Sequence, residues 1–200
     1  MAKKIILALA VIAVIVILAI FMINNNTVAV FNDGENITVE THSLANANID
    51  RFNEEVCDLT MNVMNETESN ITTLKEGIAG LCEKYGIDDA EISIDSSIGP
   101  DQIPVLVHVD GTSMLPTLKD GQSVLINKTH DVHVGDIVVA ESDEYGGIIK
   151  RVDNIQGNSV HLISDNKNIA YEYFNGQLYE IKGITTWVDV SDINGVVIDY

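Results

Sequence analysis

The second half of the chain is a series of short runs of β-forming residues, interrupted by turn signals. From residue 91 onward, these runs alternate with Asp120-Gly121, Gly146-Gly147 and Asn175-Gly176. Asn-Gly between two such runs is a strong hairpin signal. Many short strands without an alternating helical rhythm predict a mainly β module. The predicted strands cover residues 103–109, 123–127, 136–141, 147–152, 159–163, 171–174, 177–181, 184–190 and 196–198.

Residues 5–23 form an uninterrupted apolar run that follows Lys3 and Lys4. Its length is typical of one membrane-spanning helix, and lysines before such a helix indicate a cytoplasmic amino terminus. The sequence therefore predicts a single-pass cell-membrane protein. Residues 5–23 would contact lipid, and the rest of the chain would lie outside the cytoplasm. A cleaved secretory signal is the alternative, although its apolar region would be unusually long.

Apolar residues recur at helical spacing in two runs between residues 43 and 85, and polar residues 65–70 separate the runs. This pattern predicts a helical hairpin, with one long helix as the alternative. Cys57 and Cys82 are the only cysteines, one on each predicted helix. In an exported hairpin they could form a disulfide, and two buried free thiols are the other interpretation.

Ser113 follows the predicted strand at residues 103–109, in a segment that contains Gly111 and Pro116. Glycine permits a sharp turn and proline stops a helix, so the serine hydroxyl is expected to be displayed on a turn. A serine needs a base within hydrogen-bond reach before it acts as a nucleophile. Without such a base, Ser113 is an ordinary turn serine.

Lys150 is the candidate base. Strand residues alternate between faces, so Lys150 shares a face with Ile148 and Val152. A lysine on an apolar face loses hydration, which lowers its pKa and favours the neutral amine that can accept a proton. The alternative is a lysine that extends its ammonium group to the surface.

Five ordered blocks and a motif that follows them together resemble the Ser/Lys serine peptidases, which include the type I signal peptidases and the LexA-like self-cleaving repressors. The blocks are Gly111-Thr112-Ser113-Met114-Leu115-Pro116-Thr117-Leu118, Asp120-Gly121, Val124-Leu125-Ile126, Gly135-Asp136-Ile137-Val138-Val139 and Lys150-Arg151-Val152. The motif that follows is Leu162-Ile163-Ser164-Asp165-Asn166, with Tyr171 after it. The resemblance implies the coiled β fold of that family, with Ser113 as nucleophile and Lys150 as base. It implies no metal and no organic cofactor.

The resemblance also implies supporting roles. The Ser113 backbone N–H, with Thr112, would stabilise the oxyanion, because Gly111 occupies the position where signal peptidases often carry a hydroxyl. Ser164 is a candidate for orienting the lysine, because Ile148 occupies the usual position of that hydroxyl. Arg151 and Asp165 would form an ion pair that braces the site, although two separate surface charges are the simpler interpretation.

The predicted fold class is a mainly β catalytic domain of the signal peptidase/LexA-like type, preceded by one transmembrane helix and a helical hairpin stalk. The expected divisions are residues 1–24 as cytoplasmic tip and anchor, 25–100 as exported stalk, and 101–200 as peptidase domain. The expected function is a membrane-anchored serine endopeptidase. Its substrates would be exported precursor proteins with small residues before the cut.

Two alternatives remain open at this stage. One is a self-processing membrane regulator that cuts at Ala79-Gly80, as the LexA-like relatives cut an upstream Ala-Gly. The other is a catalytically inactive binding module. Nucleic-acid binding is not expected, because the formal net charge is −19 and phosphate contacts require lysine and arginine.

Overall fold

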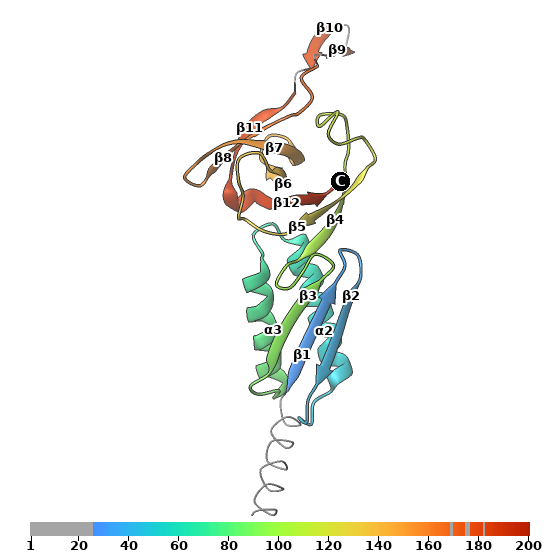
Figure 1. Cartoon of the computed structure of the whole chain (residues 1–200), viewed down its shortest axis with the longest axis vertical. Coiled ribbons are helices and arrows are strands. Elements are labelled where there is room, and N and C mark those ends of the chain that lie inside the picture. Colours follow the sequence, from blue (N-terminus) through green and yellow to red (C-terminus); the bar gives the residue numbers. More distant parts are fainter. Residues whose placement is uncertain (1–25, 169, 175–176, 182) are drawn as a thin grey trace, which may run out of the picture.

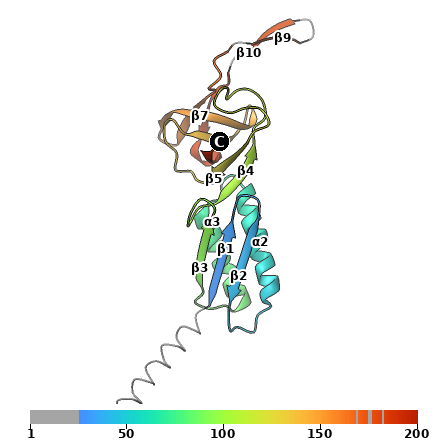
Figure 2. The same ribbon diagram turned by 45° about the vertical axis from the view of Figure 1, so that its right-hand side comes forward.

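A computed structural model describes residues 26–168, 170–174, 177–181 and 183–200. These residues form a three-stranded sheet with two helices, a seven-stranded sheet and a two-stranded hairpin. In Figures 1 and 2 the helix-bearing unit and the seven-stranded sheet follow one another along the long axis, and the hairpin projects from the far end of the larger sheet.

The smaller unit brings together two segments that lie far apart in the sequence. Its sheet has the order β2-β1-β3, in which β1 is antiparallel to β2 and parallel to β3. Both helices lie between β2 and β3 in the chain, and Figure 1 shows them on one side of the sheet. The elements are β1 (Thr27–Asn32), β2 (Ile37–His42), α2 (Ile49–Asn65), α3 (Ile71–Tyr85) and β3 (Glu91–Ser96).

Local sequence signals determine where the helices begin and end. Asn48 caps α2 by accepting a hydrogen bond from the Arg51 backbone N–H, and Asn70 caps α3 in the same way. Gly86 ends α3 in the left-handed conformation, with φ of 68°, where glycine is free of strain. The helices bury one face against the inward residues of the sheet. The shared core contains Val28, Val30, Phe52, Val56, Leu74 and Ile78.

The predicted fold class is wrong in the part that precedes the peptidase domain. The two predicted helices exist, but they do not form a stalk. Strands β1, β2 and β3 form a sheet that the apolar faces of both helices cover. Residues from the helices and the sheet share one core. Burying these faces removes apolar surface from water, which a free-standing hairpin would leave exposed.

The predicted membrane helix at residues 5–23 lies outside the described residues. Of the helices that the structure does describe, none combines the length and apolar character needed to cross a membrane. The single-pass cell-membrane localisation, with a cytoplasmic amino terminus, therefore has no support in this structure, and we correct it. The division of the chain at residues 24 and 100 remains a prediction.

The larger sheet contains seven of the nine predicted strands, in the order β11-β8-β7-β6-β12-β5-β4, and the other two form the hairpin. All its neighbouring pairs are antiparallel, and register shifts in β7 and β12 bend it. Its strands are β4 (Pro104–His108), β5 (Ser123–Asn127), β6 (Ile137–Ser142), β7 (Gly146–Gln156), β8 (Ser159–Ile163), β11 (Thr185–Asp189) and β12 (Ile193–Asp199). The hairpin is β9 (Ala170–Phe174) with β10 (Gln177–Ile181).

Both cysteines are free thiols in the structure. Cys82 is buried in the core of the smaller unit and Cys57 is half-buried. Burial raises the pKa of each thiol, since an apolar environment disfavours the thiolate. The disulfide that the hairpin prediction allowed is therefore not formed here.

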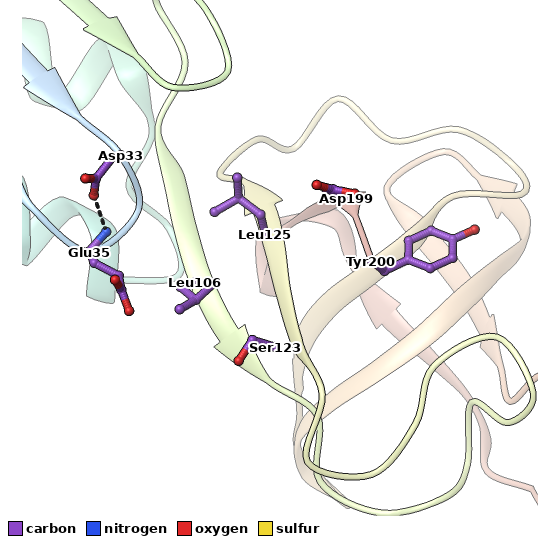
Figure 3. A pocket seen from close by; sticks show the side chains of 7 residues that line it. All are labelled: Asp33, Glu35, Leu106, Ser123, Leu125, Asp199 and Tyr200. Carbon is purple, nitrogen blue, oxygen red and sulfur yellow. Dashed lines mark hydrogen bonds between the residues drawn. The ribbon is translucent and has the colours of Figure 1, made fainter.

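Contacts at the junction connect the smaller unit to β4, the strand that leads to Ser113. The Asn32 side chain donates a hydrogen bond to the Pro104 carbonyl at 3.1 Å, and the Leu106 N–H donates to the Gly34 carbonyl at 3.3 Å. A cavity of about 470 Å³ lies beside these contacts, with Asp33 and Glu35 on one side (Figure 3). The Asp33 carboxylate there accepts a hydrogen bond from the Glu35 N–H.

Lys128, just after β5, is the one buried side chain without a hydrogen-bond partner among the described residues. It is 4% exposed, and burial lowers its pKa, with Glu66 opposing the shift. We expect Lys128→Met to raise the free energy of unfolding by about 1–4 kcal/mol, because a buried charge without a partner is costly. Urea unfolding at neutral pH measures this change.

The pH dependence supplies a second readout for Lys128. The unfolded lysine keeps its proton up to a pH of about 10.4, whereas the folded side chain releases it at lower pH. Wild-type stability should therefore rise as pH increases through the folded pKa toward the unfolded one, and Lys128→Met should lack this rise. The exposed Lys119→Met is the control. Equal stability of wild type and Lys128→Met would contradict the prediction.

Candidate active site

Ser113 lies on a turn that follows β4 directly. Gly111 adopts a positive φ of 88° there, and its N–H donates a hydrogen bond to the Asp120 carboxylate at 2.8 Å. Met114 and Leu118, which flank the rest of the turn, are buried in the core below it. The turn is therefore held from both sides, and Ser113 is left half-exposed.

Lys150 lies in the middle of β7 and is only 3% exposed. Its neighbours on the same face, Ile148 and Val152, are also buried, as strand alternation predicts. The Lys150 Nζ lies 2.8 Å from the Ser113 Oγ and 2.9 Å from the Ile149 carbonyl oxygen. Burial lowers the pKa of Lys150, because the apolar surroundings disfavour the ammonium form. The two residues that the sequence singled out are thus in direct contact.

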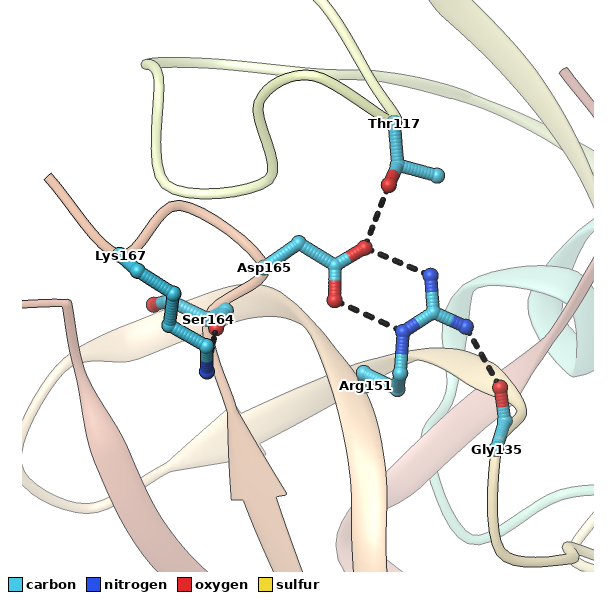
Figure 4. A network of polar contacts seen from close by, with 6 residues as sticks. All are labelled: Thr117, Gly135, Arg151, Ser164, Asp165 and Lys167. Carbon is cyan, nitrogen blue, oxygen red and sulfur yellow. Dashed lines mark hydrogen bonds and ion pairs between the residues drawn. The ribbon is translucent and has the colours of Figure 1, made fainter.

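Arg151, which follows Lys150 in β7, forms a two-bond ion pair with Asp165 (Figure 4). The guanidinium donates to the two carboxylate oxygens at 2.7 and 2.6 Å, and it also donates to the Gly135 carbonyl at 2.7 Å. The Thr117 hydroxyl donates to the same carboxylate at 2.6 Å. Hydrogen bonds from Arg151 are the main reason that the pKa of Asp165 is lowered. The carboxylate therefore connects the lysine-bearing strand to the serine turn.

Asn166 makes a second connection, which reasoning from the sequence missed. Its backbone N–H donates to the Ser113 carbonyl, and its side chain donates to the Thr112 carbonyl, both at 2.9 Å. Asn166 ends the motif at residues 162–166, which is part of the family resemblance. Its place in that motif was the only sign in the sequence that it belongs to the site. An asparagine after a strand is also common in turns, so its partners could not be read from the sequence.

The structure gives Thr112 and Ser164 different surroundings from those expected. The Thr112 side chain is exposed, and only its carbonyl takes part in the contacts of the turn. The buried Ser164 hydroxyl donates to the Ile184 carbonyl at 3.1 Å, and among the described residues no hydrogen bond joins it to Lys150. The Ile149 carbonyl, rather than Ser164, holds the amine in position.

A cleft of about 470 Å³ opens over the Ser113–Lys150 pair. Its walls are mainly apolar side chains, and the backbone of residues 109–113 forms one edge. In the described part of the chain, the Ser113 N–H has no hydrogen-bond partner. Across all the residues that the structure describes, no group of three or more His, Cys, Asp or Glu side chains is arranged to hold a metal. The side chains that line the walls include Val107, Val139, Tyr145, Ile149 and Ile184.

A serine on a turn after an edge strand, bonded to a buried lysine of the same antiparallel sheet, is the arrangement of the Ser/Lys peptidase class. Residues 76–186 match the family model described as Peptidase S24-like, which covers more than half of the chain. The chain belongs to this family. The resemblance to Ser/Lys peptidases that the sequence motifs carried is confirmed.

The chain is similar to curated proteins of two kinds. It is 32% identical over 89 residues to signal peptidase I U of Bacillus subtilis. The aligned region covers 38% of this chain and 48% of that protein. It is 34% identical over 83 residues to the LexA repressor of Pectobacterium carotovorum, covering 41% of this chain and 40% of the relative. The chain thus spans half or less of the length of these two relatives.

Proposed function

We propose that the protein is a serine endopeptidase in which Ser113 is the nucleophile and Lys150 is the general base. The 2.8 Å contact between the Lys150 Nζ and the Ser113 Oγ, made by a lysine that is 3% exposed, carries the proposal. A neutral amine accepts the hydroxyl proton, whereas an ammonium cannot. Membership of a peptidase family supports the same chemistry.

The reaction divides into acylation and deacylation. Ser113 attacks the carbonyl carbon of the scissile peptide while Lys150 takes the hydroxyl proton, and Lys150 then gives that proton to the leaving amine. The unpartnered Ser113 N–H is the candidate donor to the developing oxyanion. A water molecule, deprotonated by the same lysine, hydrolyses the acyl-enzyme. Asn166 holds the turn through the Ser113 and Thr112 carbonyls, so these groups keep their alignment.

The substrates that we propose are proteins with small side chains before the cut. Val107, Val139 and Ile149 line the walls of the cleft, so these side chains would lie against branched apolar groups. The similarity to signal peptidase I U supports this substrate class, and exported precursors are the specific substrates that we propose.

Self-processing is the second candidate, because the chain is also similar to LexA repressors. The Ala79-Gly80 bond lies inside α3, between residues whose backbones are helical. A peptidase cleft binds its substrate in an extended form, so this bond would become accessible only after α3 unwinds locally. Cleavage of other proteins is therefore the preferred function.

Incubation with denatured exported precursors tests the proposal. Purified wild type and Ser113→Ala are each mixed with the same precursors, and mass spectrometry identifies the new amino termini. We expect wild type to produce cuts that follow alanine, glycine or serine. Ser113→Ala should produce none, because it lacks the nucleophile.

The intact mass of the enzyme is recorded in the same samples. A Ser113-dependent fragment that begins at Gly80, without cleavage of any precursor, would replace the proposal with self-processing. Equal product patterns from wild type and Ser113→Ala would contradict it. Absence of products from both proteins would favour the third alternative, an inactive binding module.

A further inference from the structure

A second hydrogen-bonded group of side chains lies on three neighbouring strands of the larger sheet. Asp153 comes from β7, His161 from β8 and Thr185 from β11, which are adjacent in the sheet (Figure 1). The His161 Nδ1 lies 2.9 Å from an Asp153 carboxylate oxygen, and its Nε2 lies 2.9 Å from the Thr185 Oγ1. None of these residues contributes to the Ser113–Lys150 site.

The partners of the imidazole determine the direction of both hydrogen bonds. The Asp153 carboxylate only accepts, so the Nδ1 of His161 carries the proton and donates it. In the neutral ring the Nε2 is then an acceptor, and the Thr185 hydroxyl donates to it. Carboxylate, imidazole and hydroxyl thus stand in the order of a hydrolase triad, which is recognised by geometry rather than by chain order.

Trp187 restricts the orientation of the imidazole. The two rings stack with centroids 4.8 Å apart and an interplanar angle of 29°. Trp187 is directly opposite His161 in the strand register, and it remains 47% exposed. The ring plane that points the Nε2 at Thr185 is therefore held by packing as well as by the Asp153 hydrogen bond.

Thr185 lines a cavity of about 290 Å³ that is open to solvent. Lys167 lines the same cavity and brings positive charge to it, while Ile184 separates it from the cleft over Ser113. The cavity is smaller than most ligand pockets, which favours a short acyl group over a polypeptide.

We infer that Thr185 is a second activated hydroxyl, which accepts acyl groups from small activated esters. The Thr185 Oγ1 forms a bond to the ester carbonyl carbon while the His161 Nε2 takes its proton. The bond from that carbon to the leaving alkoxide or phenolate breaks, and the leaving group receives the proton. The products are an acyl ester of Thr185 and a free alcohol or phenol. Lys167 supplies positive charge for the carbonyl oxygen while it is anionic.

Acetylation by p-nitrophenyl acetate in the full-length Ser113→Ala protein tests this inference, independently of the proposed peptidase function. Peptide mass mapping over time follows acetyl groups at each hydroxyl. We expect Thr185 to be acetylated, and His161→Ala to slow that reaction by about 10²-fold, the contribution of a positioned general base. Asp153→Asn should also slow it, because the amide no longer fixes the Nδ1 proton.

Thr185→Val keeps the shape of the side chain and should remove the modification. Thr186→Val, on the same strand with its side chain on the other face, is the matched control and should leave Thr185 acetylation unchanged. Near-native circular dichroism of each variant excludes unfolding as the cause. Acetylation of Thr185 no faster than that of Thr186, or at an equal rate in His161→Ala, would overturn the inference.

Discussion

Lys150→Met is expected to abolish substrate cleavage as completely as Ser113→Ala, with a loss on the order of 10⁴-fold or more in kcat. Nucleophile and base act as one unit, so removing either member stops proton transfer. Methionine keeps most of the bulk of lysine and suits a side chain that is 3% exposed. The loss therefore reflects chemistry rather than unfolding, and thermal melting of the variant should confirm a folded protein.

The pH profile identifies the base more specifically. Burial lowers the pKa of Lys150, so the neutral amine becomes available at lower pH than for a lysine in water. Below the shifted pKa the ammonium cannot accept the Ser113 proton, and kcat/KM should fall tenfold per pH unit. Activity should rise with pH through this pKa and then level off.

Two further variants complete this test. Lys150→Arg should be inactive at every pH, because a guanidinium stays protonated. Lys119→Met makes the same change at an exposed lysine and should cleave at the wild-type rate. A Lys150→Met protein that retains a rate close to wild type would exclude Lys150 as the base.

Asp165→Asn should weaken both stability and catalysis. The amide loses the charge that the Arg151 guanidinium contacts through two hydrogen bonds, in a site where the carboxylate side chain is 13% exposed and that of Arg151 is 30% exposed. We expect the free energy of unfolding to fall by about 1.5–3 kcal/mol, the usual range for hydrogen bonds to charged groups. Because Asp165 also accepts from Thr117, kcat should fall about tenfold to a hundredfold as the serine turn shifts.

The stability difference between wild type and Asp165→Asn depends on pH in a defined direction. The pKa of Asp165 in the folded protein is lowered, mainly by the hydrogen bonds from Arg151. The contribution of Asp165 to the free energy of unfolding is therefore complete above its unfolded pKa of about 3.9. It is lost as pH falls through the folded pKa. Denaturant unfolding at neutral and at strongly acidic pH measures the change. Asp143→Asn, at an exposed turn position, is the control, and a difference that grows in acid would contradict the assignment.

The strands of the larger sheet could be predicted because their signals are local. The predicted runs at residues 123–127 and 159–163 coincide with β5 and β8. Glycine-containing turns and alternating apolar residues mark such strands within a few residues, wherever the strands later pair.

The smaller sheet could not be predicted in the same way. β1 pairs in parallel with β3, and both helices lie between them in the chain. The residues of β1 also follow a long apolar run, and they fall within the predicted stalk at residues 25–100. The sequence does not reveal that these strands pair with each other, so it offers no sheet for the apolar faces of the helices to cover. The prediction of a free-standing helical hairpin was therefore wrong.

The sequence alone determined that Ser113 would stand on a turn and that Lys150 would share a buried strand face with Ile148 and Val152. The turn follows from the glycine and proline near Ser113, and the shared face follows from the alternation of side chains along a strand. Both signals lie within a few residues of the sequence. Only the tertiary structure decided that the two side chains meet at 2.8 Å, and that Asn166 holds the serine turn. Distances between side chains on different strands depend on register and packing across the whole sheet, which no local pattern specifies.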